Sequence, residues 1–506
     1  MGQAERARRF PGGAAGGTVP RAPRREPGAG GRGEAGTSGG AAPFHPDSPA
    51  GRLGSPADGG AGGGSGRSGG AAGAAGTAAL RARLGARRPA GQPLKVLVVF
   101  GTRPEATKMA PVVHQLARRP AIRVQVAVTA QHRELLDQVL HLFGIEPDFD
   151  LDIMQPRQTL TDITTRALQG LEAVLRQAQP HLVLVHGDTT TTLAGALAAF
   201  YHQVAIGHVE AGLRTYDKYQ PFPEEINRRL TDALCDLHFA PTPASRANLL
   251  REGIDPAGIF VTGNTAIDAL LSVVSPGYRF RRDDLARFPS PGRRLVLCEA
   301  HRRENWGEPL EAVARALRRL VESHPDIELV YSVHPNPVVA GTIRRHLEGI
   351  ERVSLLDPPE YADWANLMAR ATLLLTDSGG LQEEAPALGL PVLLLRDKTE
   401  RPEAVEAGTV LQVGPHEEPI LRTARRLLTD PAAYRQVAQA RNPFGDGQAA
   451  RRTVEAIEYA FGLRDQPPDP WDPGLPPAQA VPAAAPAESP PGHGLSPGDP
   501  QAARSS

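Results

Sequence analysis

The sequence predicts an α/β protein with two Rossmann-like, doubly wound domains that face a central cleft. Two observations lead to this prediction. Short, continuously apolar runs recur along the chain, as in parallel strands buried on both faces, and segments of helical periodicity separate them. Residues 93–463 carry this pattern, and that length exceeds what one hydrophobic core usually supports.

Ten apolar runs are predicted strands. They are 94–100, 124–129, 182–186, 204–208, 259–263, 295–300, 327–334, 353–356, 373–377 and 392–396. Residues 106–117 and 310–321 have the period of amphipathic helices. A polar stretch with Pro289 and Pro291 marks the seam between the two sets of strands. We therefore expect one domain over 93–264 and a second over 265–446, with a last helix at 447–463 that crosses back to the first.

The two ends of the chain differ from this core. Residues 1–92 are rich in Gly, Ala and Arg, residues 464–506 are rich in Pro, and neither segment shows apolar periodicity. Such compositions bury too little surface to offset the entropy of ordering, so we expect disordered tails. The first segment lacks the compact apolar stretch of a secretory signal.

Charge and cysteine content exclude several classes. The 506 residues hold 56 Lys+Arg and 56 Asp+Glu, so nothing electrostatic favours nucleic acid or a membrane surface as partner. No apolar run approaches the ~20 residues of a membrane span. Cys235 and Cys298 are too few for a disulfide framework or a cysteine-rich zinc site. Cytoplasm is the expected compartment.

Acidic residues follow neighbouring strands of the first half, where ligands of doubly wound sheets bind. Asp188 ends one strand, Glu210 ends the next, and Glu224 and Glu225 follow in PFPEE. Any one of them is more often structural, through helix capping by Asp188 or pairing of Glu225 with Arg228. Together, carboxylates at one sheet edge favour acid-base chemistry. No histidine pair has helical metal-ligand spacing, so we expect no metal.

The loop after the first strand, Gly101-Thr102-Arg103-Pro104-Glu105, has the spacing of a capping box. Arg103 then lies at a helix N-terminus, with Lys108 one turn further on, which suits a phosphate or a carboxylate. A plain strand-to-helix turn with a solvated Arg103 is the alternative. The loop is not GxGxxG and gives no reason to expect NAD.

Polar residues also follow the strands of the second half. His301 has a side chain that titrates near neutrality, and Arg302 with Arg303 suits a diphosphate. His334 ends the next strand, and the Ser378-Gly379-Gly380 turn offers bare amides to a phosphate. The residues alone therefore predict a two-domain enzyme that binds a phosphorylated, nucleotide-linked ligand in its cleft.

Ten strings in this order resemble the non-hydrolysing UDP-N-acetylglucosamine (UDP-GlcNAc) 2-epimerases of bacteria, throughout 94–462. They are GTRPEATKMAP, TAQHRELLDQVL, HGDTTTTLAGALAAFYHQ, HVEAGLRT, PFPEEINR, FVTGNTAIDALL, AHRRENWGEP, TDSGGLQEEAP, RPEAVEAGTV and NPFGDGQA. The resemblance implies a fold like the GT-B glycosyltransferases and conversion of UDP-GlcNAc to UDP-N-acetylmannosamine (UDP-ManNAc) without nicotinamide or metal. It implies elimination of UDP to 2-acetamidoglucal and re-addition, a role in cell-surface polysaccharide, and a homodimer.

The resemblance also assigns site residues. It implies a catalytic group of Asp188, Glu210, Glu224 and His301. UDP-sugar contacts would come from Arg103, Lys108, His334, Trp364 (against uracil), Ser378, Gly379, Gly380 and Glu384. A second UDP-GlcNAc, which activates many bacterial members, would meet Gln131, His132, Arg157 and Arg302. Glu134 and the pair Cys298-Glu299 depart from the residues usual at their positions.

Four alternatives stay open from the sequence. A GT-B glycosyltransferase would share the fold but needs an acceptor site. The same chemistry on another UDP-acetamido sugar, or a hydrolysing 2-epimerase, would share the motifs. A sensor without activity is the fourth, and the intact acids and His301 argue against it.

Overall fold

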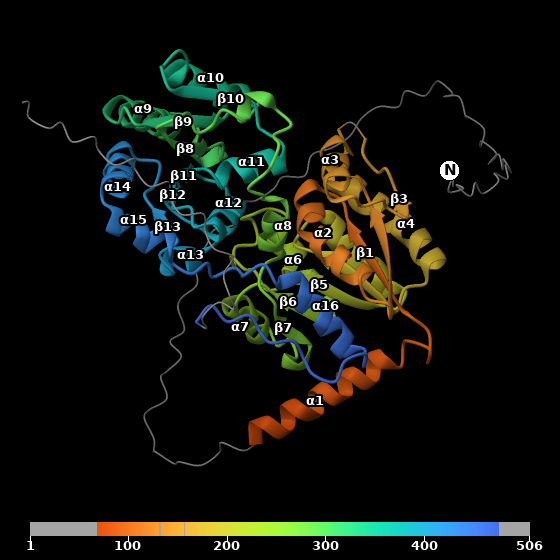
Figure 1. Cartoon of the computed structure of the whole chain (residues 1–506). Helices are drawn as coiled ribbons and strands as arrows, with labels where there is room; N and C mark the ends of the chain where they lie inside the picture. Colours follow the sequence, from red (N-terminus) through yellow and green to blue (C-terminus); the bar gives the residue numbers. More distant parts are fainter. Residues whose placement is uncertain (1–67, 131–132, 156, 475–506) are drawn as a thin grey trace, which may run out of the picture. The chain divides into compact units, whose positions relative to one another are not determined.

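The computed structural model describes residues 68–130, 133–155 and 157–474 (Figure 1). All of them belong to one compact unit, Ser65–Ser506. Residues 1–67 and 475–506 of the tails expected at 1–92 and 464–506, and the expected activator ligands Gln131 and His132, lie outside the described residues.

The first sheet has seven parallel strands in the order β3-β2-β1-β4-β5-β6-β7. Its order reverses between β1 and β4, and such a switch point opens a crevice at the carboxyl ends of the strands. The loops that contain Arg103 and Asp188 follow these two strands. The strands are β1 (Leu94–Phe100), β2 (Ile122–Val128), β3 (Phe149–Asp150), β4 (Leu182–His186), β5 (Ala205–Val209), β6 (Leu237–Ala240) and β7 (Ile259–Val261).

The second sheet has six parallel strands in the order β10-β9-β8-β11-β12-β13. Here the order reverses between β8 and β11, which are followed by His301 and Ser378. The strands are β8 (Arg294–Glu299), β9 (Ile327–Ser332), β10 (Val353–Leu356), β11 (Leu373–Thr376), β12 (Val392–Leu394) and β13 (Val410–Gln412). The predicted class of two Rossmann-like domains is confirmed.

Every predicted strand is present, with ends that shift by a few residues. Three strands, β3, β6 and β13, were not predicted from the sequence. They have two to four residues each, and two of them include an exposed or polar position, Asp150 or Gln412. β6 includes His238, so each of the three runs contains a polar residue and none gives a continuous apolar pattern.

Helices connect the strands and cover the sheets. Among the described residues, no helix combines the length and the apolar character needed to cross a membrane. The helices are α1 (Ser68–Gly85), α2 (Arg103–Ala117), α3 (Arg133–Phe143), α4 (Leu160–Ala178), α5 (Thr190–Tyr201), α6 (Glu224–Leu234), α7 (Pro243–Arg251), α8 (Thr265–Val273), α9 (Glu308–Ser323), α10 (Pro337–Leu347), α11 (Tyr361–Met368), α12 (Gly379–Glu384), α13 (Pro402–Glu406), α14 (Glu417–Thr429), α15 (Pro431–Ala438) and α16 (Ala449–Ala460), with short 3-10 turns at Pro256–Gly258, Asp283–Leu285, Arg303–Asn305 and Ala385–Leu388.

Two helices connect the halves of the core. α16 comes last of the helices in the chain, yet it packs against α2 and α8, and Val454 and Ile457 join the apolar core of the first sheet (Figure 1). α8 begins where the second domain was expected to begin. Its Ala269 lies in the core of the first sheet and its Leu270 in the core of the second. The domain limits at 264 and 446 stay predictions.

The expected tails are too long at both inner ends. The stretch Ser68–Gly85 is the helix α1, and its Leu80 and Leu84, one turn apart, are buried. Arg81 lies 4.5 Å above the ring of Tyr459 in α16. Residues 464–474 are also packed, with Trp471 only 3% exposed. Composition underestimates how much of both segments is ordered. Two leucines one turn apart, or one tryptophan, are enough to pack a segment against a surface that is already folded.

Candidate active site

A cavity of about 1130 Å³ opens where the carboxyl ends of both sheets meet. The first half supplies three of the predicted acids, and the second half supplies cations. The charged lining residues are Asp188, Glu210, Arg214, Asp217, Glu224 and Arg228 from the first half and Arg302, Glu304, Arg396, Asp397, Lys398, Glu400 and Arg401 from the second. The first half therefore forms an acidic wall with four acids and two arginines, and the second half faces it with four cations and three acids.

The loop after β1 is built around Glu105. This carboxylate is 2% exposed and accepts hydrogen bonds from the backbone N–H of Gly101 (3.0 Å) and of Thr102 (2.8 Å). The Thr189 hydroxyl, in the loop after β4, donates to the same carboxylate at 2.6 Å. The predicted capping box is thus present, and Glu105 also ties together the two loops at the switch point. Arg103 is left exposed at the start of α2.

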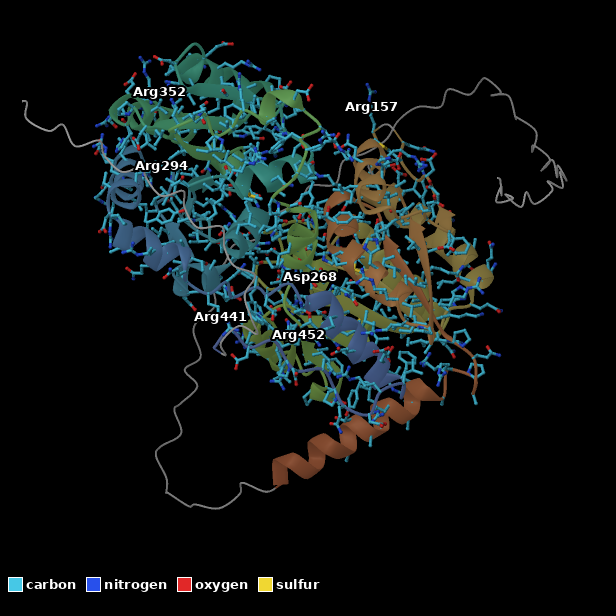
Figure 2. The ribbon with its side chains drawn as sticks, viewed as in Figure 1. Arg157, Asp268, Arg294, Arg352, Arg441 and Arg452 are labelled. Carbon is cyan, nitrogen blue, oxygen red and sulfur yellow. The ribbon has the colours of Figure 1, made fainter. Side chains whose placement is uncertain are left out.

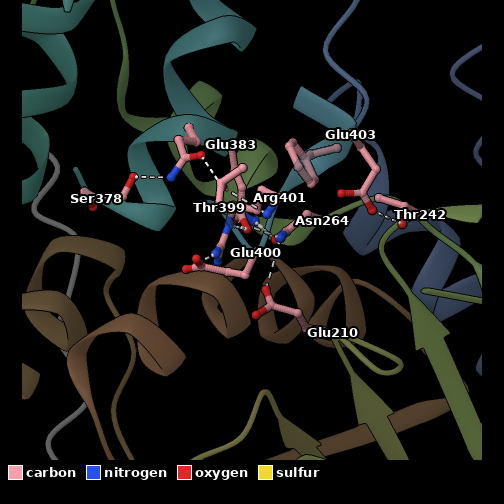
Figure 3. A network of polar contacts seen from close by, with 12 residues as sticks. Glu210, Thr242, Asn264, Ser378, Glu383, Thr399, Glu400, Arg401 and Glu403 are labelled. Carbon is pink, nitrogen blue, oxygen red and sulfur yellow. Dashed lines mark hydrogen bonds and ion pairs between the residues drawn. The ribbon is translucent and has the colours of Figure 1, made fainter. Parts of the chain in front are cut away.

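Lys108 connects the two halves of the site. Its Nζ lies 2.5 Å from Oε2 of Glu210 and 3.6 Å from Oε2 of Glu383 in α12. The Asn264 side-chain amide donates to the same two carboxylates, at 3.0 and 3.1 Å (Figure 3). Burial by itself would lower the pKa of Lys108, but the two carboxylates outweigh it and raise that pKa.

Glu210 is held ionised in a strained turn. Its φ is +69°, which few residues with a side chain adopt, and it follows β5 directly. His186 Nε2 lies 3.6 Å from its Oε2. Burial would raise the pKa of Glu210, but the charges of Lys108 and His186 and the hydrogen bond from Lys108 hold it well below its usual value.

Asp188 and Glu224 occupy different environments in the same cavity. Asp188 Oδ2 accepts a hydrogen bond of 2.6 Å from Nη2 of Arg228, while Asn227 donates to its backbone carbonyl. Glu224 is the first residue of α6, and burial, with the nearby charge of Asp188, raises its pKa. Glu210 and Glu224 therefore have pKa shifts of opposite sign.

Glu225 is a structural residue. It is fully buried and accepts hydrogen bonds from the backbone N–H groups of Thr215 and Tyr216, both at 3.0 Å. Its pairing with Arg228, expected from the sequence, is present at 3.7 Å. Of the two acids in PFPEE, only Glu224 lines the cavity.

Asp377 organises the loop after β8. This carboxylate is fully buried and accepts hydrogen bonds from the backbone N–H of His301 (2.9 Å) and of Arg302 (2.8 Å), and from the Asn305 amide (2.9 Å). Asp377 belongs to the string TDSGG, but no role was predicted for it. Its only signal in the sequence is its position at the end of a strand.

His301, after β8, lies against His334, after the adjacent strand β9. The two rings stack with centroids 5.0 Å apart. Burial lowers the pKa of His301, and the negative charge of Asp377 opposes this. Glu299 Oε1 lies 3.6 Å from Nδ1 of His301.

The positive charge of Arg103 acts on two carboxyl groups of the second half, Glu384 and Glu299. Burial raises the pKa of Glu384 to about 8, and the positive charges of Lys108 and Arg103 oppose this. Burial likewise raises the pKa of Glu299 to about 7, with the charge of Asp377 adding to it and that of Arg103 opposing it. The predicted basic pair of α2 thus lies near the strand ends of the second sheet.

The guanidinium group of Arg401 packs against the Gly-rich turn at the start of α12. Arg401 Nε donates to Glu383 at 2.6 Å and its Nη1 donates to Glu400 at 2.7 Å (Figure 3). A Cβ on Gly379 would lie 2.7 Å from Nη1 of Arg401, so the guanidinium packs directly on this glycine. Arg401 was not among the predicted site residues, although the string RPEAVEAGTV contains it.

Among the described residues, the predicted ones that line this cavity are Asp188, Glu210, Glu224 and Arg302. The predicted residues outside its lining are Arg103, Lys108, His301, His334, Ser378, Gly379, Gly380 and Glu384, as well as the two that follow. Trp364 is 6% exposed and packs in the core of the second sheet beside Leu270 and Phe280. Arg157 is exposed in the loop before α4 (Figure 2). Of the expected activator ligands, Arg302 lines the cavity. Within the described residues, no three His, Cys, Asp or Glu side chains gather as metal ligands would.

Two Rossmann-like domains whose charged strand ends face a shared cavity define an enzyme of GT-B-like architecture. A family profile described as UDP-N-acetylglucosamine 2-epimerase matches residues 114–458. The chain belongs to this family, whose members are isomerases, and the resemblance stated from the sequence is confirmed.

Known proteins match over nearly their whole length. The UDP-N-acetylglucosamine 2-epimerase of Bacillus subtilis strain 168 is 55% identical over 376 residues, which are 74% of this chain and 98% of that protein. A crystal structure of a UDP-N-acetylglucosamine 2-epimerase superposes with a TM-score of 0.70 at 52% identity, over 75% and 100% of the two chains. The Neisseria meningitidis UDP-GlcNAc 2-epimerase bound to UDP-GlcNAc gives 0.67 at 47% identity, over 72% and 99%.

Proposed function

We propose that this chain catalyses the reversible epimerisation of UDP-GlcNAc to UDP-ManNAc. The observation that carries the proposal is the pairing of Glu210 and Glu224 in one cavity, with pKa shifts of opposite sign. Two carboxyl groups whose environments separate their pKa values are suited to act as base and acid at one carbon. The family and the UDP-GlcNAc complex of the Neisseria enzyme support this choice of substrate.

The reaction would begin with elimination. A carboxylate takes the C2 proton while the C1–O bond breaks, its electron pair leaves with UDP, and 2-acetamidoglucal remains. UDP then adds back at C1 while a carboxyl group returns a proton to the opposite face of C2. The C2 hydrogen is weakly acidic, so departure of UDP must share the work with proton removal.

The acids would divide this work. Glu210, held ionised by Lys108, is suited to accept a proton, and Glu224, with its raised pKa, is suited to donate one. Asp188, paired with Arg228, completes the acidic wall. His301 would act from the second domain, near the diphosphate or C1.

The leaving diphosphate would be stabilised by cations and amides from both domains. The proposed UDP ligands are Arg103, Lys108, His334, Ser378, Gly379, Gly380 and Glu384, and the cavity-lining Arg401 joins them. Trp364 would contribute from the core beneath the uracil position, since its indole is almost wholly buried. Positive charge that is already in place costs no reorganisation when the C1–O bond breaks.

Four further expectations belong to the same proposal. They are a second UDP-GlcNAc as activator, a homodimer, a cytoplasmic location, and supply of ManNAc units for cell-surface polysaccharide. In the activator set, Arg302 lies in the cavity while Arg157 lies on an exposed loop.

Incubation with UDP-GlcNAc in D₂O, followed by proton NMR, tests the proposal. UDP-ManNAc should appear, with deuterium at C2 of both sugars, because the proton is exchanged during each epimerisation. UDP and free sugar instead would indicate a hydrolysing enzyme. An unchanged spectrum would contradict the proposal and direct the assay to other UDP-acetamido sugars, and then to a transferase with added acceptors.

A further inference from the structure

The segment that follows α16 has two buried residues, Pro468 and Trp471. Residues 464–474 lie beyond residue 458, where the match to the family profile ends. Arg464, at its start, offers its carbonyl to Arg81 of α1 at 3.0 Å. Trp471 is 3% exposed, although its neighbours in sequence are polar residues and prolines. The structure therefore buries this single indole against the domains themselves.

The chain passes between its two domains twice, and the two crossings touch. The first crossing leaves β7 and enters α8 through Asn264, and the second leaves α15 and enters α16 through Phe444. The Asn264 backbone N–H donates to the Phe444 carbonyl at 2.6 Å. Arg452 of α16 adds a hydrogen bond to the Thr262 carbonyl at 3.3 Å. Any change in the angle between the domains must be absorbed in these segments.

Trp471 is bonded to both crossings at once. Its backbone N–H donates to the Val261 carbonyl at the end of β7, at 2.8 Å. Its indole Nε1–H donates to the Pro443 carbonyl in the second crossing, also at 2.8 Å. The guanidinium carbons of Arg441 and Arg452 lie 4.8 and 5.5 Å from the ring centroid. A desolvated cation over the face of an indole ring adds a favourable cation–π interaction to these hydrogen bonds.

The surroundings of this indole are fixed by further contacts. Arg452 pairs with Asp446 through two hydrogen bonds of 2.7 Å, and Asp268 of α8 accepts from the backbone N–H groups of Ala449 and Ala450 at the start of α16. Figure 2 shows Asp268, Arg441 and Arg452 in this region, where α16 meets α8. The ring thus rests on groups that are themselves held in place.

We propose that Trp471 is a positioning residue: it fastens the two interdomain crossings to each other and so limits how far the active-site cavity opens. The catalytic side chains come from both domains, so they meet only when the interdomain angle is right. The inference about the hinge does not depend on the reaction. Its consequence for catalysis rests on the proposed function.

Loss of the indole should act on substrate affinity more than on chemistry. In Trp471→Ala the closed form becomes less populated, and the apparent affinity falls by the same factor as that population. We expect KM for UDP-GlcNAc to rise about tenfold, while kcat changes by less than about threefold. Trp471→Phe keeps a ring between the guanidinium groups and loses only the Nε1–H donor, so it should show a smaller rise.

The direct test measures the distance between the domains. Spin labels at Arg176→Cys in α4 and Arg318→Cys in α9 report it, because both positions are exposed. The labelled protein is diluted with unlabelled protein so that only distances within one chain contribute, and labelling of the parent chain corrects for Cys235 and Cys298. Trp471→Ala should widen the distribution and shift it to longer distances.

A matched control variant distinguishes an effect on the interdomain angle from a general loss of stability. Phe143→Ala removes a buried aromatic side chain from the core of the first sheet, away from both crossings. It should lower the melting temperature and leave the interdomain distribution and KM unchanged. If Trp471→Ala leaves the distribution as in the parent chain, the proposal is wrong, whatever the activity. Absence of turnover in the parent chain would instead contradict only the proposed function.

Discussion

Lys108 Nζ lies 2.5 Å from Oε2 of Glu210, although the two residues are 102 positions apart in the chain. The same ammonium group lies 3.6 Å from Glu383 of the second domain. One cation therefore holds the proposed base ionised and also bridges the two domains. This contact explains why a deeply buried carboxylate keeps its charge.

Replacement of Lys108 by methionine should show this dependence. Without the cation, burial dominates and the pKa of Glu210 rises. The acidic limb of the pH–rate profile should move to higher pH, and kcat should fall by about 100-fold or more. Lys95→Met, in β1 and away from the cavity, is the control and should keep the profile of the parent chain. An unshifted profile for Lys108→Met would remove Glu210 from the role of base.

Glu224 and Glu225 provide a matched pair of identical substitutions. Glu224→Gln should cut turnover by about 100- to 10,000-fold with the melting temperature unchanged, because its carboxyl faces the cavity. Glu225→Gln should instead destabilise the fold by about 1–3 kcal/mol, since its amide group cannot accept from both Thr215 and Tyr216. Calorimetry and initial rates on both variants separate the roles, and equal rate losses without destabilisation would contradict them.

Asp188→Asn and Glu210→Gln should also lower turnover by orders of magnitude while the fold survives. Circular dichroism would verify the fold, and the D₂O exchange experiment would show whether the C2 proton still leaves. Rates close to that of the parent chain in all three acid variants would overturn the proposed acidic group.

The stability of the fold should decrease as pH rises toward 8. Burial raises the pKa of Glu384 from 4.5 to about 8, so the folded state favours the protonated carboxyl. That stabilisation is fully present below about pH 4.5 and is lost as pH rises through about 8. Glu384→Gln should flatten the melting temperature over this window, leaving the smaller slopes from Glu299 and Asp268. An unchanged slope would show that Glu384 is ionised throughout.

Gly101 should tolerate no side chain. A Cβ there would lie 2.0 Å from Oγ1 of Thr129 and 2.5 Å from Oγ1 of Thr191, so Gly101→Ala should cost about 1–3 kcal/mol in chemical denaturation. Gly341→Ala is the control. Gly341 is exposed in α10 with no atom near its missing Cβ, and alanine there should be neutral or stabilising by up to about 1 kcal/mol. Equal stabilities of the two variants would contradict the packing argument.

Part of the site could be predicted from the order of residues along the chain. Asp188 and Glu210 follow strong apolar runs that form adjacent strands of the first sheet, and parallel strands bring their carboxyl ends to one edge, so strand order alone placed these two residues together. Arg103 was predictable in the same way, from a strand, a capping box and a helix start. Local pattern was sufficient wherever a residue's position depends only on the strand it follows.

Contacts between residues far apart in the chain could not be predicted from local pattern. Asp377 and Arg401 look like ordinary surface charges until folding closes the loops that bury them. Trp364 shows the reverse case. The resemblance placed this aromatic side chain at the ligand, but the structure buries it almost wholly in the core. The choice between Glu224 and Glu225, one residue apart, depended on which side of α6 faces the cavity.

The sequence by itself determined the two doubly wound sheets and the order of polar residues at the strand ends, because these follow from local apolar period and turn chemistry. The family followed from the resemblance of ten motif strings in order. Only the tertiary structure decided which charges pair, which acid is ionised, that α1 packs on α16, and that Trp471 joins both crossings. Those outcomes depend on distances between residues far apart in the chain, and burial turns such distances into large free energies.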